Sequence, residues 1–279
     1  TIRAAKRAGA DAIKLQTYTA DTLTIQSDKE DFVIKSGSIW DGKTFYDLYE
    51  SAYTPWEWHE KLFLCAREEG LICFSSPFDK TAVDFLESLN VPAYKIASFE
   101  ILDIPLIEYA ASKGKPMILS TGIAEIEDIE LAIETCKKAG NNDITILKCT
   151  SAYPADPKDA NLLTIPDIKS KFGVKAGLSD HTMGIEGPVV AVALGATVIE
   201  KHFTFDRSEG GPDAEFSMEP HELKDLCSSI STAYKAIGKG GFEMKPAEES
   251  NIKFRRSIYV VQDIQQGEKF DKENIRRIR

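Results

Sequence analysis

The sequence lacks any apolar run approaching the about 18 residues that a membrane-spanning helix needs. Its longest run, near Gly187–Leu194, has the length of a short buried segment. An excess of basic residues is also missing: the net charge is −10, which argues against a nucleic acid or an acidic membrane as the partner. With 43% hydrophobic and 28% charged residues, the chain is typical of a globular protein with one large domain, or one large and one small.

Paired cysteines are missing too. The five cysteines include no C-x-x-C motif, so they indicate neither a disulfide framework nor a zinc site, and we expect reduced core thiols in a cytoplasmic protein. The chain opens with TIRAAKRAGADAIKLQ, which is helical in pattern and has no starting methionine. We therefore expect a fragment that begins inside a helix. Any targeting signal would lie upstream, so the expected location rests on the cysteines alone.

Short β-rich runs alternate with helical patterns along most of the chain. The expected strands are 11–17, 71–76, 93–98, 116–121, 144–150, 174–179 and 197–203. Expected helices include 56–69, 81–89, 104–112, 126–139, 186–194 and 219–237. This alternation predicts right-handed βαβ units and a parallel sheet.

The α/β pattern favours a TIM (β/α)₈ barrel, of which seven strands are visible and an eighth is required. Because the sequence starts within a helical pattern, we expect the first barrel strand and the start of its helix to lie upstream. An open Rossmann-like sheet is the alternative, but no G-x-G-x-x-G motif follows any expected strand.

Two segments interrupt this rhythm. Residues 18–53, which include SIWDGKTFYDLY, form a long insertion of the kind that serves as a lid or a substrate-binding loop. Residues 238–247 have the Gly, Lys and Pro content of a linker. We therefore expect a barrel domain over 1–240, a linker over 241–254 and the start of a small second domain over 255–279.

Polar residues gather where the expected strands end, which is where TIM barrels carry their chemistry. Lys14 and Lys95 stand inside strands that should be almost wholly apolar, so each needs a carboxylate partner or an anionic ligand. Pairing with a carboxylate in the barrel is one interpretation. We favour a cradle for phosphate and carboxylate groups, completed by hydroxyls and amides. The other polar side chains at these ends include Gln16, Ser75, Ser76, Ser98, Glu100, Ser120, Ser151, Tyr153, Ser179, Asp180, Glu200 and Lys201.

Two of the four histidines, His181 and His202, end consecutive strands. Adjacent strands can direct both imidazoles at one divalent ion and leave coordination positions open for substrate oxygens. The alternative is a pair of hydrogen-bonded core histidines. His59 and His221 fall on expected helices, and we expect both at the surface. Tyr153 and the W-E-W at 56–58 are also compatible with packing alone.

The strand ends, read as strings, resemble the sialic acid synthase family. The matching segments are AGADAIKLQT, SSPFD, YKIAS-x-E, ILSTG, CTSAYP, GLSDHT-x-GI and ALGATVIEKHFT followed by GPDAEFS, in the family's order. The tail RRSIYVVQDIQQGEKF is similar to the start of the family's C-terminal antifreeze-like (SAF) domain. Within the family, the lid and the segments FSSPFDKTAVDFLESLNVPAYKIASFE and LKCTSAYPA look most like pseudaminic acid synthases.

The resemblance implies a transferase that condenses phosphoenolpyruvate with 2,4-diacetamido-2,4,6-trideoxy-altrose to give pseudaminic acid and phosphate. A divalent metal, expected as Mn²⁺ with Mg²⁺ or Co²⁺ as alternatives, would be held by His181 and His202. Glu100 matches the family's candidate acid–base or water-positioning carboxylate. The residues that match its substrate contacts are Lys14, Gln16, Lys95, Ser98, Ser120, Ser151 and Ser179 for phosphoenolpyruvate, with Tyr153 and Asp213 for the sugar.

The resemblance also implies a domain-swapped homodimer, in which a SAF-domain arginine reaches the partner's site; Arg279 matches that arginine. Two features depart from the family. Its first strand carries a Glu near an Asn-His pair that this sequence does not contain, and Ser151 stands where other members have Asn.

Two other functions stay open. An N-acetylneuraminate or legionaminate synthase would use another acetamido sugar, and the lid over 36–53 would decide, because Trp40, Phe45 and Tyr46 are expected to pack on a 6-deoxy methyl group. A non-catalytic sugar-binding module belongs to another class. The intact lysines, Glu100 and histidines argue against it.

Overall fold

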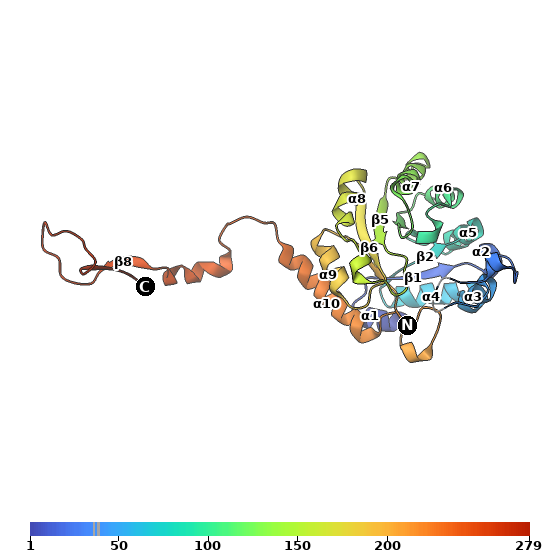
Figure 1. Cartoon of the computed structure of the whole chain (residues 1–279), viewed down its shortest axis with the longest axis horizontal. Helices are drawn as coiled ribbons and strands as arrows, with labels where there is room; N and C mark the ends of the chain where they lie inside the picture. Colours follow the sequence, from blue (N-terminus) through green and yellow to red (C-terminus); the bar gives the residue numbers. More distant parts are fainter. Residues whose placement is uncertain (36, 38–39) are drawn as a thin grey trace. The chain divides into compact units, whose positions relative to one another are not determined.

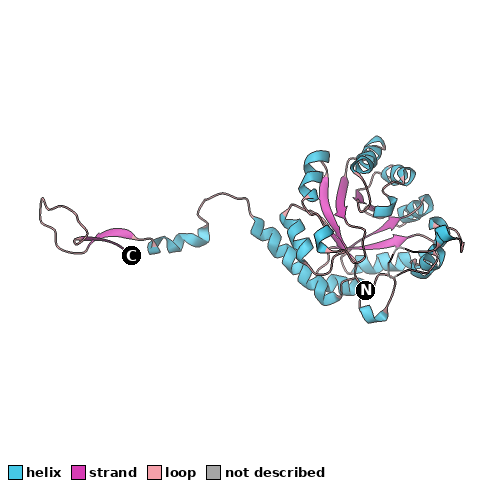
Figure 2. Ribbon diagram, viewed as in Figure 1, coloured by secondary structure: helices cyan, strands magenta, loops and turns pink. Residues whose placement is uncertain are grey.

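The computed structural model describes residues 1–35, 37 and 40–279, and its larger unit is a curled parallel sheet with helices along its outer side (Figures 1 and 2). Seven strands pair in chain order, each parallel to the next. They are β1 (Ala12–Thr17), β2 (Ile72–Pro77), β3 (Tyr94–Ile96), β4 (Met117–Ser120), β5 (Ile144–Cys149), β6 (Lys175–Asp180) and β7 (Ile199–Lys201). All seven expected strands are confirmed in the expected order.

The helices begin and end where the local sequence provides caps. Asp79 accepts hydrogen bonds from the backbone N–H groups of Thr81 and Ala82 at the start of α5, and Gly9 ends α1 with a left-handed φ of 101°. The helices are α1 (Ile2–Ala8), α2 (Ala20–Leu23), α3 (Phe45–Ala52), α4 (Trp56–Glu68), α5 (Lys80–Ser88), α6 (Ile104–Ala111), α7 (Ile126–Lys138), α8 (Thr164–Phe172), α9 (Glu186–Ala193) and α10 (Pro220–Ile237).

Side chains alternate between the two faces of the central strands. Met117 and Leu119 of β4 are fully buried in the main apolar core, whereas Ile118 and Ser120 face a cavity on the inner side of the sheet. In β3, Lys95 likewise lines the cavity between two residues that belong to the core. The period of two therefore lets one strand supply both the core and the site.

The helix layer closes on itself where the sheet does not. Helix α10 packs against α1 through Ala5, Ala8, Leu223 and Leu226, and Figure 1 shows the two helices side by side. Among the described residues, no strand pairs with the outer edge of β1 or of β7. Most side chains of these two strands are only partly buried.

The insertion over 18–53 contains structure of its own: α2, a 3₁₀ helix η1 (Glu30–Phe32), α3 and a single antiparallel bridge between Val33 and Thr44. Ser36, Ser38 and Ile39 belong to the expected lid and lie outside the described residues. The insertion follows β1 directly and precedes α4.

Residues 238–279 form a separate unit. It contains a 3₁₀ helix, η5 (Pro246–Phe254), and the antiparallel strands β8 (Ser257–Val260) and β9 (Ile275–Ile278). The segment expected to be a linker over 241–254 thus includes a short helix. Within the described part of the chain, no helix has the length and apolar character needed to cross a membrane. All five cysteines are free.

Candidate active site

One cavity of about 2340 Å³ collects most of the expected site residues on the inner side of the sheet. It also extends between β1 and β7. The expected residues that line it are Lys14, Gln16, Lys95, Ser98, Glu100, Ser120, Tyr153, Ser179, His181, His202 and Asp213. Ser151 is not among the described lining residues, and Arg279 lies in the unit over 238–279, beside Arg256, Arg276 and Arg277.

The two strand lysines share one carboxylate. Glu200 of β7 lies 3.0 Å from Lys14 Nζ and 3.7 Å from Lys95 Nζ, and it accepts a 2.9 Å hydrogen bond from Ser179 Oγ. The carboxylate pairing that we did not favour is therefore present. The hydroxyls of Ser98, Ser120 and Ser179, which we expected in the cradle, line the same cavity.

The charges of this group depend on one another. Lys95 is 1% exposed, and burial lowers its pKa to about 8 although Glu200 opposes the shift. Burial would raise the pKa of Glu200, but Lys14 and Lys95 hold it below its usual range. The group carries a net positive charge when both lysines are protonated, which suits an anionic ligand.

His181 and His202 follow β6 and β7 directly, and their ring centroids are 5.2 Å apart. His181 Nδ1 lies 2.8 Å from the carbonyl oxygen of Thr150, which only accepts, so this nitrogen carries the proton. His202 Nδ1 lies 3.3 Å from a carboxylate oxygen of Asp213. Both Nδ1 atoms therefore face an oxygen partner and leave Nε2 toward a ligand, the arrangement usual for metal-binding histidines. Burial lowers the pKa of His202, whereas in His181 burial is outweighed by the contact with Cys149, which raises the pKa of that imidazole.

An aromatic wall surrounds these imidazoles. The Tyr153 ring lies 4.3 Å from the ring of His181, and the Phe216 ring lies 5.0 Å from that of His202. Tyr153 also contacts Trp40 of the lid, at 5.8 Å between centroids. Asp213, which we expected on the sugar side, is at the same time the partner of His202. Phe216 was missed in the sequence, although it lies within the matching segment GPDAEFS.

Glu100 is a partly buried carboxyl group whose burial outweighs the nearby charge of Lys95. It ends the 3₁₀ helix η2 (Ser98–Glu100), and its Oε2 atom is buried without a hydrogen-bond partner among the described residues. Burial raises its pKa to about 7. A carboxyl group that titrates near neutrality is suited to give and accept a proton.

Gly122 leaves the space that the hydroxyls of Ser151 and Ser98 occupy. A Cβ atom at Gly122 would lie 1.9 Å from Ser151 Oγ, 2.8 Å from Ser98 Oγ and 2.9 Å from Ser98 Cβ, so a side chain at this position would displace both serines. The backbone N–H of Gly122 donates to Ser98 Oγ at 3.1 Å. The Oγ atoms of Ser151 and Ser120 have no hydrogen-bond partner in the described part of the chain. These hydroxyls are free to bind a ligand or water.

The expectation that His59 lies at the surface was wrong. Its side chain is fully buried, with Nε2 2.8 Å from Thr17 Oγ1 and Nδ1 3.2 Å from the carbonyl oxygen of Pro55. Thr17 Oγ1 also binds Ser75 Oγ at 2.7 Å. These hydrogen bonds join β1 and β2 to the start of α4. The end of β1 and the start of α4 flank the insertion over 18–53. His221 is exposed, as expected.

The lid aromatics do not act as one cluster. Trp40 donates from Nε1 to the carbonyl oxygen of Pro212 at 3.0 Å, and Phe45 stacks on Tyr49; both Trp40 and Phe45 line the cavity. Tyr46 instead donates to Asp21 at 3.2 Å and is absent from the described lining. Two of the three residues expected to meet the sugar are therefore placed to do so.

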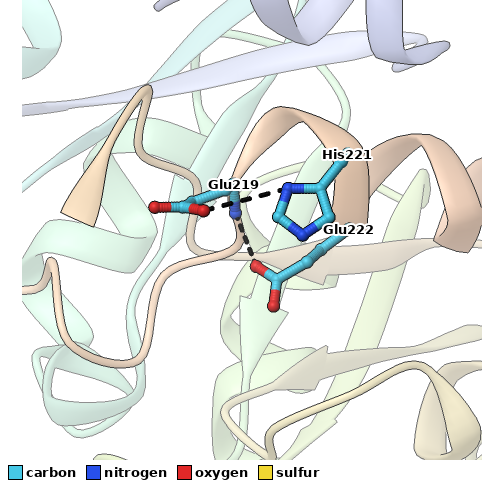
Figure 3. Close-up of side chains that lie close together, drawn as sticks. All are labelled: Glu219, His221 and Glu222. Atoms are coloured by element: carbon cyan, nitrogen blue, oxygen red, sulfur yellow. Dashed lines mark hydrogen bonds and ion pairs between the residues drawn. The ribbon is translucent and has the colours of Figure 1, made fainter.

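A second group of potential metal ligands lies at the start of α10. Glu219, His221 and Glu222 come close together there (Figure 3). Both carboxylates bind Arg207, which also donates from Nε to the carbonyl oxygen of Ser217 at 2.9 Å. The two carboxylates are therefore compensated by Arg207, whose hydrogen bond to Ser217 anchors the loop that carries Asp213 and Phe216.

Comparison with known proteins agrees with this geometry. The model of the NeuB family matches residues 1–241. The chain belongs to the NeuB family. It is 49% identical to pseudaminic acid synthase of Campylobacter jejuni subsp. jejuni serotype O:23/36, over all of this chain and 81% of that protein. It is 46% identical to pseudaminic acid synthase of Helicobacter pylori, over all of this chain and 82% of that one.

A solved structure of the NeuB family resembles the fold over most of its length. The N-acetylneuraminic acid (sialic acid) synthetase of Leptospira borgpetersenii serovar Hardjo-bovis superposes with a TM-score of 0.79 and 35% identity. The match covers 91% of this chain and 84% of that one. The resemblance found in the strand ends is thereby confirmed.

Proposed function

We propose that this chain is the catalytic part of a pseudaminic acid synthase, a transferase that joins phosphoenolpyruvate to 2,4-diacetamido-2,4,6-trideoxy-altrose. One observation carries the proposal: a lysine pair and an imidazole pair converge on one cavity in a chain whose close relatives are named pseudaminic acid synthases. The lysines suit the anionic substrate, and the imidazoles suit the ion that would activate the sugar aldehyde.

His181 and His202 would hold a divalent metal, with Mn²⁺ as our first choice, because both present Nε2 and have oxygen partners behind Nδ1. Bound there, the ion would supply Lewis-acid polarisation of the aldehyde oxygen. Asp213 would orient His202. Phe216 and Tyr153 would exclude water and restrict the sugar to one side of the imidazoles.

The residues of this chain have separate tasks in the reaction. Lys14 and Lys95 hold the phosphate and carboxylate groups of phosphoenolpyruvate, with help from the hydroxyls of Ser98, Ser120 and Ser179. Carbon C3 of phosphoenolpyruvate forms a bond with the aldehyde carbon, whose oxygen takes up a proton. Water then adds to C2, and cleavage of the C2–O bond releases phosphate. Glu100, which titrates near neutrality, positions this water and accepts its proton.

Phosphate release in the full-length protein tests this proposal. Phosphoenolpyruvate is offered with Mn²⁺ and either the diacetamido-trideoxy-altrose or N-acetylmannosamine. We expect release with the first sugar only, and none after chelation of the metal. Release with N-acetylmannosamine alone would assign the chain to the N-acetylneuraminate synthases.

We also propose that the sheet is seven-eighths of a TIM barrel, whose remaining strand would fill the space between β1 and β7. Three features support this: the closed helix layer at α1 and α10, the two unpaired sheet edges among the described residues, and the cavity between them. In the full-length protein, the backbone amides of β1 and β7 should then exchange with solvent as slowly as those of β4. Fast exchange at both edges would contradict a closed barrel.

For residues 238–279 we propose the start of a SAF domain that caps the site of a second copy, with Arg279 directed at the substrate. This segment exposes Ile258, Val260 and Phe270 and carries ten basic against seven acidic residues, a net +3, which leaves −13 on residues 1–237. Opposite charge and uncovered apolar surface both favour association. Sedimentation should detect a homodimer; a monomer at micromolar concentration would contradict it. The free thiols favour the cytoplasm as the compartment.

A further inference from the structure

Strands β6 and β7 carry three consecutive pairs of polar residues at their carboxyl ends, and the first two are cross-strand pairs of the sheet. Ser179 lies opposite Glu200 and donates to it at 2.9 Å. Asp180 lies opposite Lys201, and their charged groups are 2.9 Å apart. The next residues along the two strands are His181 and His202. The Ser179–Glu200 pair, the Asp180–Lys201 pair and the two histidines therefore follow one another along the same two strands.

The middle pair is the most deeply buried ion pair among the described residues. The side chains of Lys201 and Asp180 are 4% and 3% exposed. Lys201 Nζ also donates to the carbonyl oxygens of Thr182 and Gly184, while Asp180 accepts from the backbone N–H and the hydroxyl of Thr182. The pair thus ties the end of β7 to the turn that follows His181.

A contribution to stability alone does not account for such a pair. Taking both charges out of water is costly, and a buried ion pair can often be replaced by apolar residues of similar size without loss of stability. Strand geometry suggests another role. A slip of one residue between β6 and β7 would turn His202 to the opposite face of the sheet, away from His181.

We propose that Asp180 and Lys201 are positioning residues for the two imidazoles: their ion pair fixes the β6–β7 register and the turn after β6, so that His181 and His202 converge. The inference deepens the proposed metal site and rests on it. Because side chains alternate along a strand, the pair leaves the sheet on the opposite face to the imidazoles, although Lys201 also borders the part of the cavity that lies between β1 and β7. It therefore acts through the backbone and not as a ligand.

Mn²⁺ binding to the substrate-free, full-length protein tests this role. Lys201→Met and Asp180→Asn should weaken Mn²⁺ binding, measured by calorimetry, by about 10- to 100-fold, as loss of an outer partner of a metal site does. The matched control is Lys175→Met. Lys175 begins the same strand and also pairs with an aspartate, Asp143 at 2.8 Å, but these side chains are 62% and 50% exposed. This variant should bind Mn²⁺ as the wild type does.

A double variant separates positioning from stability. Asp180→Leu with Lys201→Met replaces the ion pair by apolar side chains, so its Tm should return toward that of the wild type. Its Mn²⁺ affinity should stay low, because nothing then holds the carbonyl groups of the turn. The visible absorption of bound Co²⁺ should change as well, since it reports the geometry of the ligands.

The outcomes separate the positioning role of the ion pair from the existence of the metal site. Wild-type Mn²⁺ affinity and an unchanged Co²⁺ spectrum in the folded double variant would overturn the positioning role and leave the metal site standing. Absence of Mn²⁺ binding in the wild type, or binding that persists in His202→Ala, would overturn the metal site and the inference with it.

Discussion

The two ends of the same sheet use charge in opposite ways. At the amino ends of the strands, both side chains of the Lys175–Asp143 pair are at least half-exposed, and the Lys115–Glu87 pair is only partly buried. At the carboxyl ends, Lys95, Lys201 and Asp180 are almost completely buried. Solvated pairs contribute about 0–1 kcal/mol each, whereas buried charges oppose folding unless they are well compensated. We infer that the buried charges at the carboxyl ends serve the chemistry of the site and lower the stability of the fold.

The largest effect expected from this contrast is that of His202→Ala. If His202 holds the proposed metal, its loss should lower kcat by about a thousandfold or more, since Lewis-acid activation contributes several kcal/mol and about 1.4 kcal/mol corresponds to tenfold. The exposed His221 provides the matched variant, His221→Ala, which should keep full activity. Steady-state phosphate release measures both, and equal rates for the two variants would remove the distinction between the histidines.

Glu100→Gln should lower kcat by about 100-fold or more and abolish the ionisation near pH 7 in the rate profile. The pKa of Glu100 is raised in the folded protein, so its stability contribution is complete below the ordinary value of 4.5 and is lost as the pH rises through about 7. Glu100→Gln should therefore unfold at a higher temperature than the wild type above pH 7. Glu108→Gln, at an exposed position of α6, should change neither profile.

Lys95→Met is expected to separate binding from stability. Loss of a charge-assisted hydrogen bond, worth about 1.5–3 kcal/mol, should raise KM for phosphoenolpyruvate by about 10- to 100-fold. The Tm should fall little or rise, because a buried charge is replaced by an apolar side chain of similar length while Glu200 keeps Lys14 and Ser179 as partners. A large loss of Tm with an unchanged KM would mean that Lys95 serves the fold and not the substrate.

The smallest effects on stability and activity are expected for the ion pairs at the amino ends of the strands. Asp143→Asn should change the free energy of unfolding by at most about 0.5 kcal/mol and leave kcat and KM unchanged, because its partner Lys175 stays solvated. Denaturant unfolding with parallel kinetics checks this. An effect comparable to that of Lys95→Met would show that the two ends of the sheet do not differ as described.

Several site residues escaped sequence reasoning for identifiable reasons. We expected Glu200 only as a polar strand residue. Because side chains alternate between the two faces of a strand, Glu200 and His202 lie on the same face of β7 and its extension. Phe216 has no periodic pattern around it because it lies in a loop. His59 was wrongly expected at the surface, because the helical pattern around it does not show that its side chain packs against the hydroxyl of Thr17 in β1.

The order of the seven strands, their polar ends and the adjacency of His181 and His202 could be predicted from the sequence, because they follow from local periodicity and from the parallel pairing of consecutive strands. Three contacts became visible only in the folded chain: Glu200 joins Lys14 to Lys95, Asp213 supports His202, and Trp40 reaches Pro212. These contacts join residues far apart along the chain. They depend on how loops and strand ends pack together, which no local pattern encodes.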